Sequence, residues 1–263
     1  MTKKTSRSRR SVEANAAPKS KQEKRAEAKR ERERIRRAAS RRRRLERLGV
    51  ATMVVLAIAG VAFLISRPKV GGGTATATER RLLAEAGHAS KVVGCEGVRN
   101  VGSYDPASED QSHIGADVAS PPPLSSYASV PPASGPHDQS PLPAGIYSSA
   151  PPVYRVIHSL EHGAAVVWYD PAASGAELER IRSFFGEPAD RDHVIVAPYD
   201  YPTEGAVGSL PAGTQMALVA WHNVQTCERV SLPVAFDFVA HYRSPPAPGQ
   251  PYKGEAPEPG APV

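Results

Sequence analysis

One uncharged apolar segment constrains this chain more than any other feature. Residues 49–65 read GVATMVVLAIAGVAFLI and contain no charged side chain. At about 1.5 Å of rise per residue, a helix over residues 48–66 spans a hydrocarbon core of roughly 30 Å. Basic residues flank the segment on both sides, which disfavours the alternative of a helix buried in a soluble domain. We therefore predict a single transmembrane helix over residues 48–66.

The distribution of charge predicts the orientation of this helix. Residues 1–47 contain 20 Lys and Arg but 6 Asp and Glu, whereas residues 70–263 contain 11 and 21. Because basic residues favour the cytoplasmic side, we expect a single-pass protein of the cell membrane with a cytoplasmic N-terminus and an extracytoplasmic C-terminal domain. A cleaved signal peptide is the alternative, since residues 75–77 (ATA) resemble a cleavage site. They lie 12 residues beyond the apolar segment, which favours an uncleaved anchor.

The segments on either side of the predicted helix lack a pattern for packing. Residues 1–47 are mostly charged and small, without apolar periodicity, so we predict a basic, disordered cytosolic arm. Such an arm can contact anionic lipids. It contains no aromatic residue for base stacking, so we expect no specific nucleic-acid partner. Residues 67–78 include VGGGTATAT and are typical of a flexible linker.

The remaining chain predicts one small α+β domain over residues 79–243. Short apolar runs bounded by turn residues predict strands at 164–169, 193–198 and 216–221. Helical spacing predicts a helix at 176–185, and residues 79–88 resemble a short helix that ends at Gly87. Residues 234–242 fit either a strand or a helix, and we favour a final helix packed on the sheet. We therefore expect a small mixed sheet with one or two packed helices. Residues 244–263 contain seven prolines and are predicted to form a Pro-rich tail.

A Pro-rich stretch lies inside this domain. Residues 121–152 contain ten prolines, a composition typical of disorder. His137, Tyr147 and several glycines are interspersed among them, and long loops inside compact domains are often functional. We therefore predict a long, ordered, extended loop that wraps the core.

The chain has two cysteines, Cys95 and Cys227, and both follow the predicted span. Outside the cytoplasm, an even pair favours a disulfide. Two separate buried thiols are the alternative. A metal site built on these two residues lacks the C-x-x-C spacing that such sites usually show.

Histidine marks the candidate site. His113, His137, His158 and His162 lie in the motif-like segments, and Glu161 is adjacent to the last of them. Imidazole is the commonest metal ligand in proteins, and several imidazoles with a carboxylate suit Zn or Cu. We therefore take the four histidines as candidate ligands, with Glu161 as a second-shell group or a general base.

Residues 158–162, HSLEH, match the H-x-x-E-H string of inverzincin metalloproteases. That chemistry needs both histidines on one face of a helix, with the glutamate acting on a metal-bound water. Gly163 and the β-like run that follows it indicate a helix of only one turn. In a strand the two histidines would stand about 13 Å apart, whereas a tight turn at residues 159–161 would bring them together.

These motifs resemble the DUF3105 family, a bacterial and archaeal family of unknown function. The matching pieces are His113, residues 131–137 (PPASGPH), 145–147 (GIY), 158–163 (HSLEHG) with an apolar strand ending at Tyr169, the pair Ala220-Trp221, and residues 256–258 (APE). The resemblance covers residues 90–260 approximately, and it implies an N-terminal anchor, an exported domain and a Pro-rich segment that belongs to that domain. It marks His113, His137, His158, Glu161 and His162 as motif positions. At His222 the resemblance implies a small or glycine-like residue, so we do not count it in the site.

Three functions remain open from the sequence. The leading hypothesis is a membrane-anchored extracytoplasmic domain of unknown activity that binds Zn or Cu through the motif histidines. The second is a metal-dependent hydrolase with Glu161 as general base. The third is a structural or partner-binding module without metal, whose histidines hydrogen-bond to loop backbone and pin the Pro-rich segment to the sheet.

Overall fold

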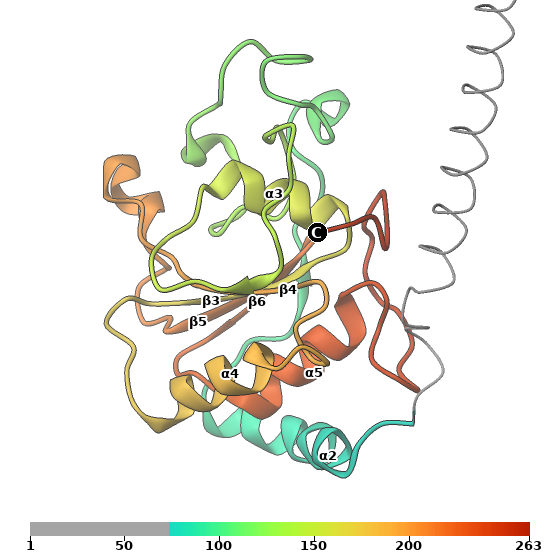
Figure 1. Ribbon diagram of the computed structural model, residues 1–263. Coiled ribbons are helices and arrows are strands. Elements are labelled where there is room, and N and C mark those ends of the chain that lie inside the picture. Colours follow the sequence, from blue (N-terminus) through green and yellow to red (C-terminus); the bar gives the residue numbers. More distant parts are fainter. Residues whose placement is uncertain (1–73) are drawn as a thin grey trace, which may run out of the picture. The chain divides into compact units, whose positions relative to one another are not determined.

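The computed structural model describes residues 74–263, which form a mixed α+β domain (Figure 1). The cytosolic arm, the transmembrane helix over 48–66 and most of the linker predicted above lie outside the described residues. Within residues 74–263, no helix is both long enough and apolar enough to cross a membrane.

Six strands form one mixed sheet in the order β1-β6-β5-β3-β4-β2. The strands are β1 (Arg99–Asn100), β2 (Gly145–Ile146), β3 (Ala165–Tyr169), β4 (Val194–Pro198), β5 (Met216–Ala220) and β6 (Asn223–Cys227). The pairs β2–β4 and β3–β4 are parallel, whereas β3–β5, β5–β6 and β1–β6 are antiparallel. The three strands predicted from apolar runs are therefore the adjacent central strands β3, β4 and β5.

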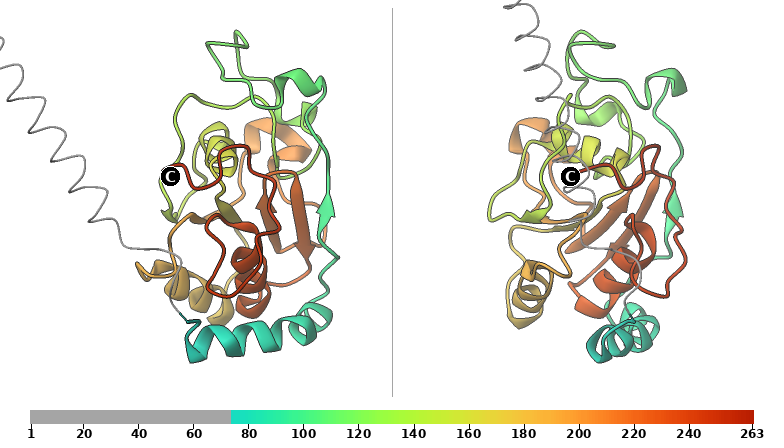
Figure 2. Two further views of the ribbon diagram at one scale, coloured as in Figure 1. Left: turned by 90° about the vertical axis from the view of Figure 1, so that its right-hand side faces the viewer. Right: turned by 45° about the vertical axis from the view of Figure 1, so that its right-hand side comes forward.

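The described part of the chain contains four α-helices, three of which cover the sheet, where we expected one or two packed helices. They are α2 (Ala77–Val92), α3 (Val153–Glu161), α4 (Ala176–Gly186) and α5 (Leu232–Tyr242). Helix α3 lies on one face, α4 and α5 lie on the other, and α2 packs outside α5 (Figures 1 and 2). Short 3₁₀ turns at Ala107–Glu109, Leu124–Ser126 and Pro202–Gly208 complete the secondary structure.

Both faces of the sheet are buried, which explains the unbroken apolar runs of the central strands. In β3, Ala165, Val167 and Tyr169 face the core shared with α2, α4 and α5. Val166 and Trp168 face the opposite core, which α3 and the Pro-rich loop close. The loop is ordered against the domain, as predicted, because its own Leu124, Tyr127 and Leu142 belong to this second core.

The first described helix differs from its prediction. Thr76 and Glu79 form a capping box at its start. The helix then continues through Gly87 to Val92, five residues beyond the predicted stop. Leu82 and Ala86 are buried on this helix, and packing against α5 outweighs the weak helical preference of one glycine. Just after it, Cys95 and Cys227 have their sulfur atoms 2.05 Å apart, the distance of a disulfide.

Candidate metal centre

Helix α3 carries the HSLEH segment, contrary to the expectation of a single helical turn. The apolar positions Val153, Val156, Ile157 and Leu160 have helical spacing, and all four are buried against the sheet. This spacing was present in the sequence and is the signal that could have identified the helix. Because the helix begins at Val153, the HSLEH segment occupies its last turn rather than the whole helix.

Gly163 ends helix α3 with a backbone that only glycine adopts readily. Its φ is +91°, and a Cβ atom there would lie 2.7 Å from the Cβ of Ser244. The chain therefore turns at once into β3. The last turn of α3 is held at one end of the sheet, where His158, Glu161 and His162 lie on one face of the helix.

Two other segments bring histidines to this turn. His137 comes from the Pro-rich loop and His113 from the loop before it, and the two backbones pair through His137 N–H to Ser112 O at 2.9 Å and Ile114 N–H to His137 O at 2.8 Å. Ser159 ties the Pro-rich loop to α3, because its hydroxyl donates to Leu142 O and accepts from Leu142 N–H, both at 2.8 Å. The histidines are thus placed by paired backbone rather than by free loops.

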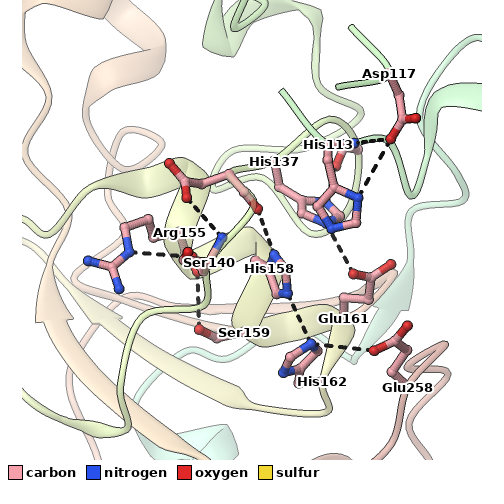
Figure 3. Close-up of polar contacts among 12 residues, drawn as sticks. His113, Asp117, His137, Ser140, Arg155, His158, Ser159, Glu161, His162 and Glu258 are labelled. Atoms are coloured by element: carbon pink, nitrogen blue, oxygen red, sulfur yellow. Dashed lines mark hydrogen bonds and ion pairs between the residues drawn. The ribbon is translucent and has the colours of Figure 1, made fainter. Parts of the chain in front are cut away.

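Four side chains converge as a result (Figure 3). One donor atom from each of His113, His137, His158 and Glu161 lies within 4.8 Å of all the others. Around a tetrahedral Zn ion with ligands at about 2.1 Å, two donors lie about 3.4 Å apart, so the widest separations in this group would contract by roughly 1.4 Å on binding. Three of the residues are buried, and His113 is partly exposed.

The structure groups the predicted ligands differently from the sequence prediction. His113, His137 and His158 lie together, whereas His162 lies beside the group: its Nε2 is 3.0 Å from His158 Nε2. Glu161, expected as a second-shell group or base, stands inside the group, with Oε2 at 3.1 Å from His137 Nε2. One donor that sequence reasoning missed is Glu258 of the Pro-rich tail, whose Oε2 lies 3.5 Å from His162 Nε2.

In each histidine ring, the hydrogen bond that Nδ1 makes determines whether Nε2 is free to bind a metal. The Nδ1–H of His137 donates to Gly135 O at 2.8 Å, that of His158 to Asp138 O at 2.6 Å, and that of His162 to Pro262 O at 2.7 Å. His113 Nδ1 lies 3.6 Å from the Asp117 carboxylate. A ring that donates from Nδ1 carries its lone pair on Nε2, and such outer hydrogen bonds are typical of metal-binding histidines.

The electrostatics of the group favour a cation. Burial lowers the pKa of His158, and the neighbouring His137 and His162 lower it further, although its hydrogen bond to Asp138 opposes this. Burial raises the pKa of Glu161, but its hydrogen bond with His137 and the nearby imidazoles outweigh burial and hold that pKa below its usual value. A lowered histidine pKa at His158 and a lowered carboxyl pKa at Glu161 both favour the protonation states that metal ligands need.

Comparison with known proteins supports the resemblance seen in the motifs. Residues 124–259 match the sequence model of a family described as "Protein of unknown function (DUF3105)". The chain belongs to the DUF3105 family. The match includes His137, His158, Glu161, His162 and Glu258, and it begins after His113. No curated protein and no solved structure matches the chain significantly.

The family match also clarifies the end of the domain. It extends to residue 259, beyond the boundary at 243 that we predicted, and the structure packs the tail against the domain. Glu258 N–H donates to Glu161 O at 3.0 Å, and Gly260 N–H donates to His162 O at 3.0 Å. In this DUF3105 protein, the Pro-rich tail is therefore part of the candidate centre.

His222 fits the glycine-like position expected for it. Its φ is +59°, a left-handed conformation that glycine adopts at little cost. Its ring joins no metal-like group; instead Nε2 lies 2.8 Å from Asp110 Oδ2 and Nδ1 lies 3.3 Å from Glu255 Oε2. This DUF3105 chain thus uses a histidine here to link the tail to the loop that contains Asp110.

Proposed function

We propose that this protein is a membrane-anchored, extracytoplasmic metal-binding protein that holds Zn or Cu. His113, His137, His158 and Glu161 are the ligands, and His162 adjoins them. The charge asymmetry of the sequence supports the anchor and its orientation. Three imidazoles and one carboxylate are a donor set that both metals accept.

One observation carries the metal proposal. His158 Nε2 and His162 Nε2 lie 3.0 Å apart, while both rings donate their Nδ1–H to backbone carbonyls. In neutral rings this places two lone pairs face to face, which is repulsive unless a cation lies beside them. Because one donor atom each from His113, His137, His158 and Glu161 also gathers within 4.8 Å at this place, we assign that role to a metal ion.

The other two hypotheses are less well supported. The hydrolase needs Glu161 as a base separate from the ligands, yet its carboxylate contacts His137 and lies among the donors. The purely structural module explains the Nδ1 hydrogen bonds but gives no reason for the Nε2 atoms to converge. Metal binding accounts for both nitrogen atoms of each ring.

The test is metal content. The full chain, purified without a histidine tag, is dialysed against Zn or Cu and then against buffer, and bound metal is measured by mass spectrometry. We expect close to one ion per chain, and a His158→Ala/His162→Ala double variant should lose it. His88→Ala, at an exposed position of α2, is the matched control.

Folding of the double variant must be checked by circular dichroism. Glu161→Gln provides a second, more conservative test, because it keeps the side-chain volume and removes the carboxylate charge. Both variants should weaken metal binding. A wild-type chain that binds neither metal, or a double variant that binds as the wild type does, contradicts the proposal.

A further inference from the structure

Three side chains form a line from the candidate centre to solvent (Figure 3). His158 is 5% exposed, the His162 side chain is 11% exposed and the Glu258 side chain is 61% exposed. The successive donor atoms are separated by 3.0 Å from His158 to His162 and by 3.5 Å from His162 to Glu258. Along this line, a hydrated ion from solvent meets a carboxylate first, then an imidazole, and then the buried donors. The 35% exposed side chain of His113 offers a second approach to the same centre.

The backbone holds Glu258 at this position. Residues 255–263, which we call the C-terminal segment, run from the α5 side of the domain to the end of α3 (Figure 2). The segment is bound to the last turn of α3 by Glu258 N–H to Glu161 O, by Gly260 N–H to His162 O, and by His162 Nδ1–H to Pro262 O. On its far side, His193 Nε2–H donates to Ala261 O at 2.9 Å. These contacts leave the Glu258 carboxylate facing His162 and solvent.

From this arrangement, we propose that Glu258 and His162 form an outer capture pair that first binds the divalent ion and passes it to His158 and the inner donors. This inference rests on the proposed metal-binding function. No bond within a side chain changes: the ion exchanges water for Glu258 and His162, then exchanges Glu258 for His158 and the remaining ligands. The carboxylate attracts the cation, and the 3.0 Å step lets the two imidazoles contact the same ion during transfer.

A second exposed carboxylate serves as the natural comparison. Asp117 is 56% exposed in its side chain and lies 3.6 Å from His113 Nδ1. Its Oδ2 already accepts the His113 backbone N–H at 2.8 Å, so it is engaged in holding the turn. Asp117 approaches the nitrogen that imidazole uses for an outer hydrogen bond, whereas Glu258 approaches Nε2 of His162, which carries the lone pair.

The experiment measures how fast the stripped full chain takes up Zn from a chromophoric chelator in stopped-flow mixing, and how much Zn it holds at equilibrium. Glu258→Gln keeps the backbone contacts of the segment and removes the negative charge. We expect uptake to slow by about fivefold or more, with the same final stoichiometry. Glu179→Gln, which removes an exposed carboxylate from α4 on the other face of the sheet, is the matched control and should load within about twofold of the wild-type rate. Glu258→Asp should recover part of the loss.

The possible outcomes separate the two proposals. Glu258→Gln that binds Zn at the wild-type rate and stoichiometry overturns the capture pair and leaves metal binding intact. The capture pair is also overturned if Glu179→Gln slows uptake as much as Glu258→Gln does. A wild-type chain that holds neither Zn nor Cu at equilibrium contradicts the proposed function itself, and this inference with it. Raised ionic strength should shrink the difference between wild type and Glu258→Gln, because salt screens the attraction.

Discussion

Imidazole has two nitrogen atoms, and the candidate centre uses both of them. In His137, Nδ1 donates to Gly135 O and pins the Pro-rich loop, while Nε2 contacts Glu161. His158 and His162 divide their nitrogens in the same way. Metal binding and loop attachment, which the sequence presents as rival hypotheses, are therefore compatible in one ring. The choice of acceptor at Nδ1 decides which way the other nitrogen presents its lone pair.

His222 shows a different use of both ring nitrogens. Each faces a carboxylate, Asp110 on one side and Glu255 on the other, so both nitrogens donate when the ring is charged. Burial opposes the charge, but the contacts with Asp110 and Glu255 outweigh burial and raise the pKa of His222. For Asp110, burial likewise opposes ionisation, but His222, Ser134 and the Tyr104 N–H lower its pKa.

We predict a pH-dependent stability from this network. A raised histidine pKa stabilises the fold fully below the unfolded value of about 6.5, and that contribution is lost as pH rises through the folded pKa. His222→Asn, which tolerates the positive φ, should reduce the free energy of unfolding by about 1–2 kcal/mol near pH 6 and by less at pH 9. Urea denaturation of both proteins across this range measures the difference.

The difference between the two proteins isolates His222 from other groups. The contact with Asp192 also raises the pKa of His193, although burial opposes it. The pH dependence of stability in the wild-type protein alone therefore reflects both histidines. Below about pH 4 the lowered pKa of Asp110 reverses the trend, because its contribution is lost as pH falls. An equal loss of stability at pH 6 and pH 9 would show that the charge of His222 contributes nothing.

At the scale of elements, two helices differ from what their local sequence predicts: one continues past a glycine, and the other forms from residues with weak helical preference. Helix α2 continues through Gly87 because its buried face packs on α5. Helix α3 forms although its sequence, VYRVIHSLE, is rich in β-branched and aromatic residues, because four apolar side chains at helical spacing are buried against the sheet. Burial decides both cases, and in α3 it also fixes the face on which the histidines lie.

Two glycines give a matched prediction for these helices. Gly87 lies inside α2 with no atom within 4 Å of an added Cβ, so Gly87→Ala should stabilise the protein by about 0.5–1 kcal/mol. Gly163→Ala should destabilise it by about 1 kcal/mol or more, because φ is +91° and the new Cβ meets Ser244. Urea denaturation measures both changes, and Gly87→Ala that destabilises the chain would place the end of α2 nearer to the predicted stop.

At the scale of the whole molecule, charge separates two parts of the chain. The first 47 residues have a net charge of +14, and residues 70–263 have a net charge of −10. The apolar residues 49–65 lie between them. This order supports the proposed single span, with the acidic part on the far side of the membrane from the basic arm.

We predict that the full chain resists extraction from membranes by alkaline carbonate, and that deletion of residues 49–65 releases it. In intact spheroplasts, added protease should reach the C-terminal domain and leave the basic arm protected. Epitope tags at the two ends, followed by immunoblotting, measure both. Protection of the C-terminal tag from protease would contradict the proposed orientation. Release of the intact full chain by carbonate would contradict the proposed membrane anchor.

The sequence by itself determined what depends on local pattern. Apolar runs identified the three central strands, and helical spacing identified α4, because its burial repeats with a regular period. Helix α5 stayed ambiguous in the sequence, because it is buried at consecutive positions and shows no single apolar face. The motifs identified the family and named the histidines with Glu161. The predicted cysteine pair also lies at disulfide distance in the structure.

Only the tertiary structure decided how these residues meet. His113, His137 and His158 come from three separate segments, and a convergence within 4.8 Å depends on backbone pairing and on the packing of α3, which no local pattern specifies. The same holds for Glu258, which reaches His162 from a distant part of the chain because the C-terminal segment binds the backbone of α3. Sequence names donor types, but the distances between donors are a property of the folded chain.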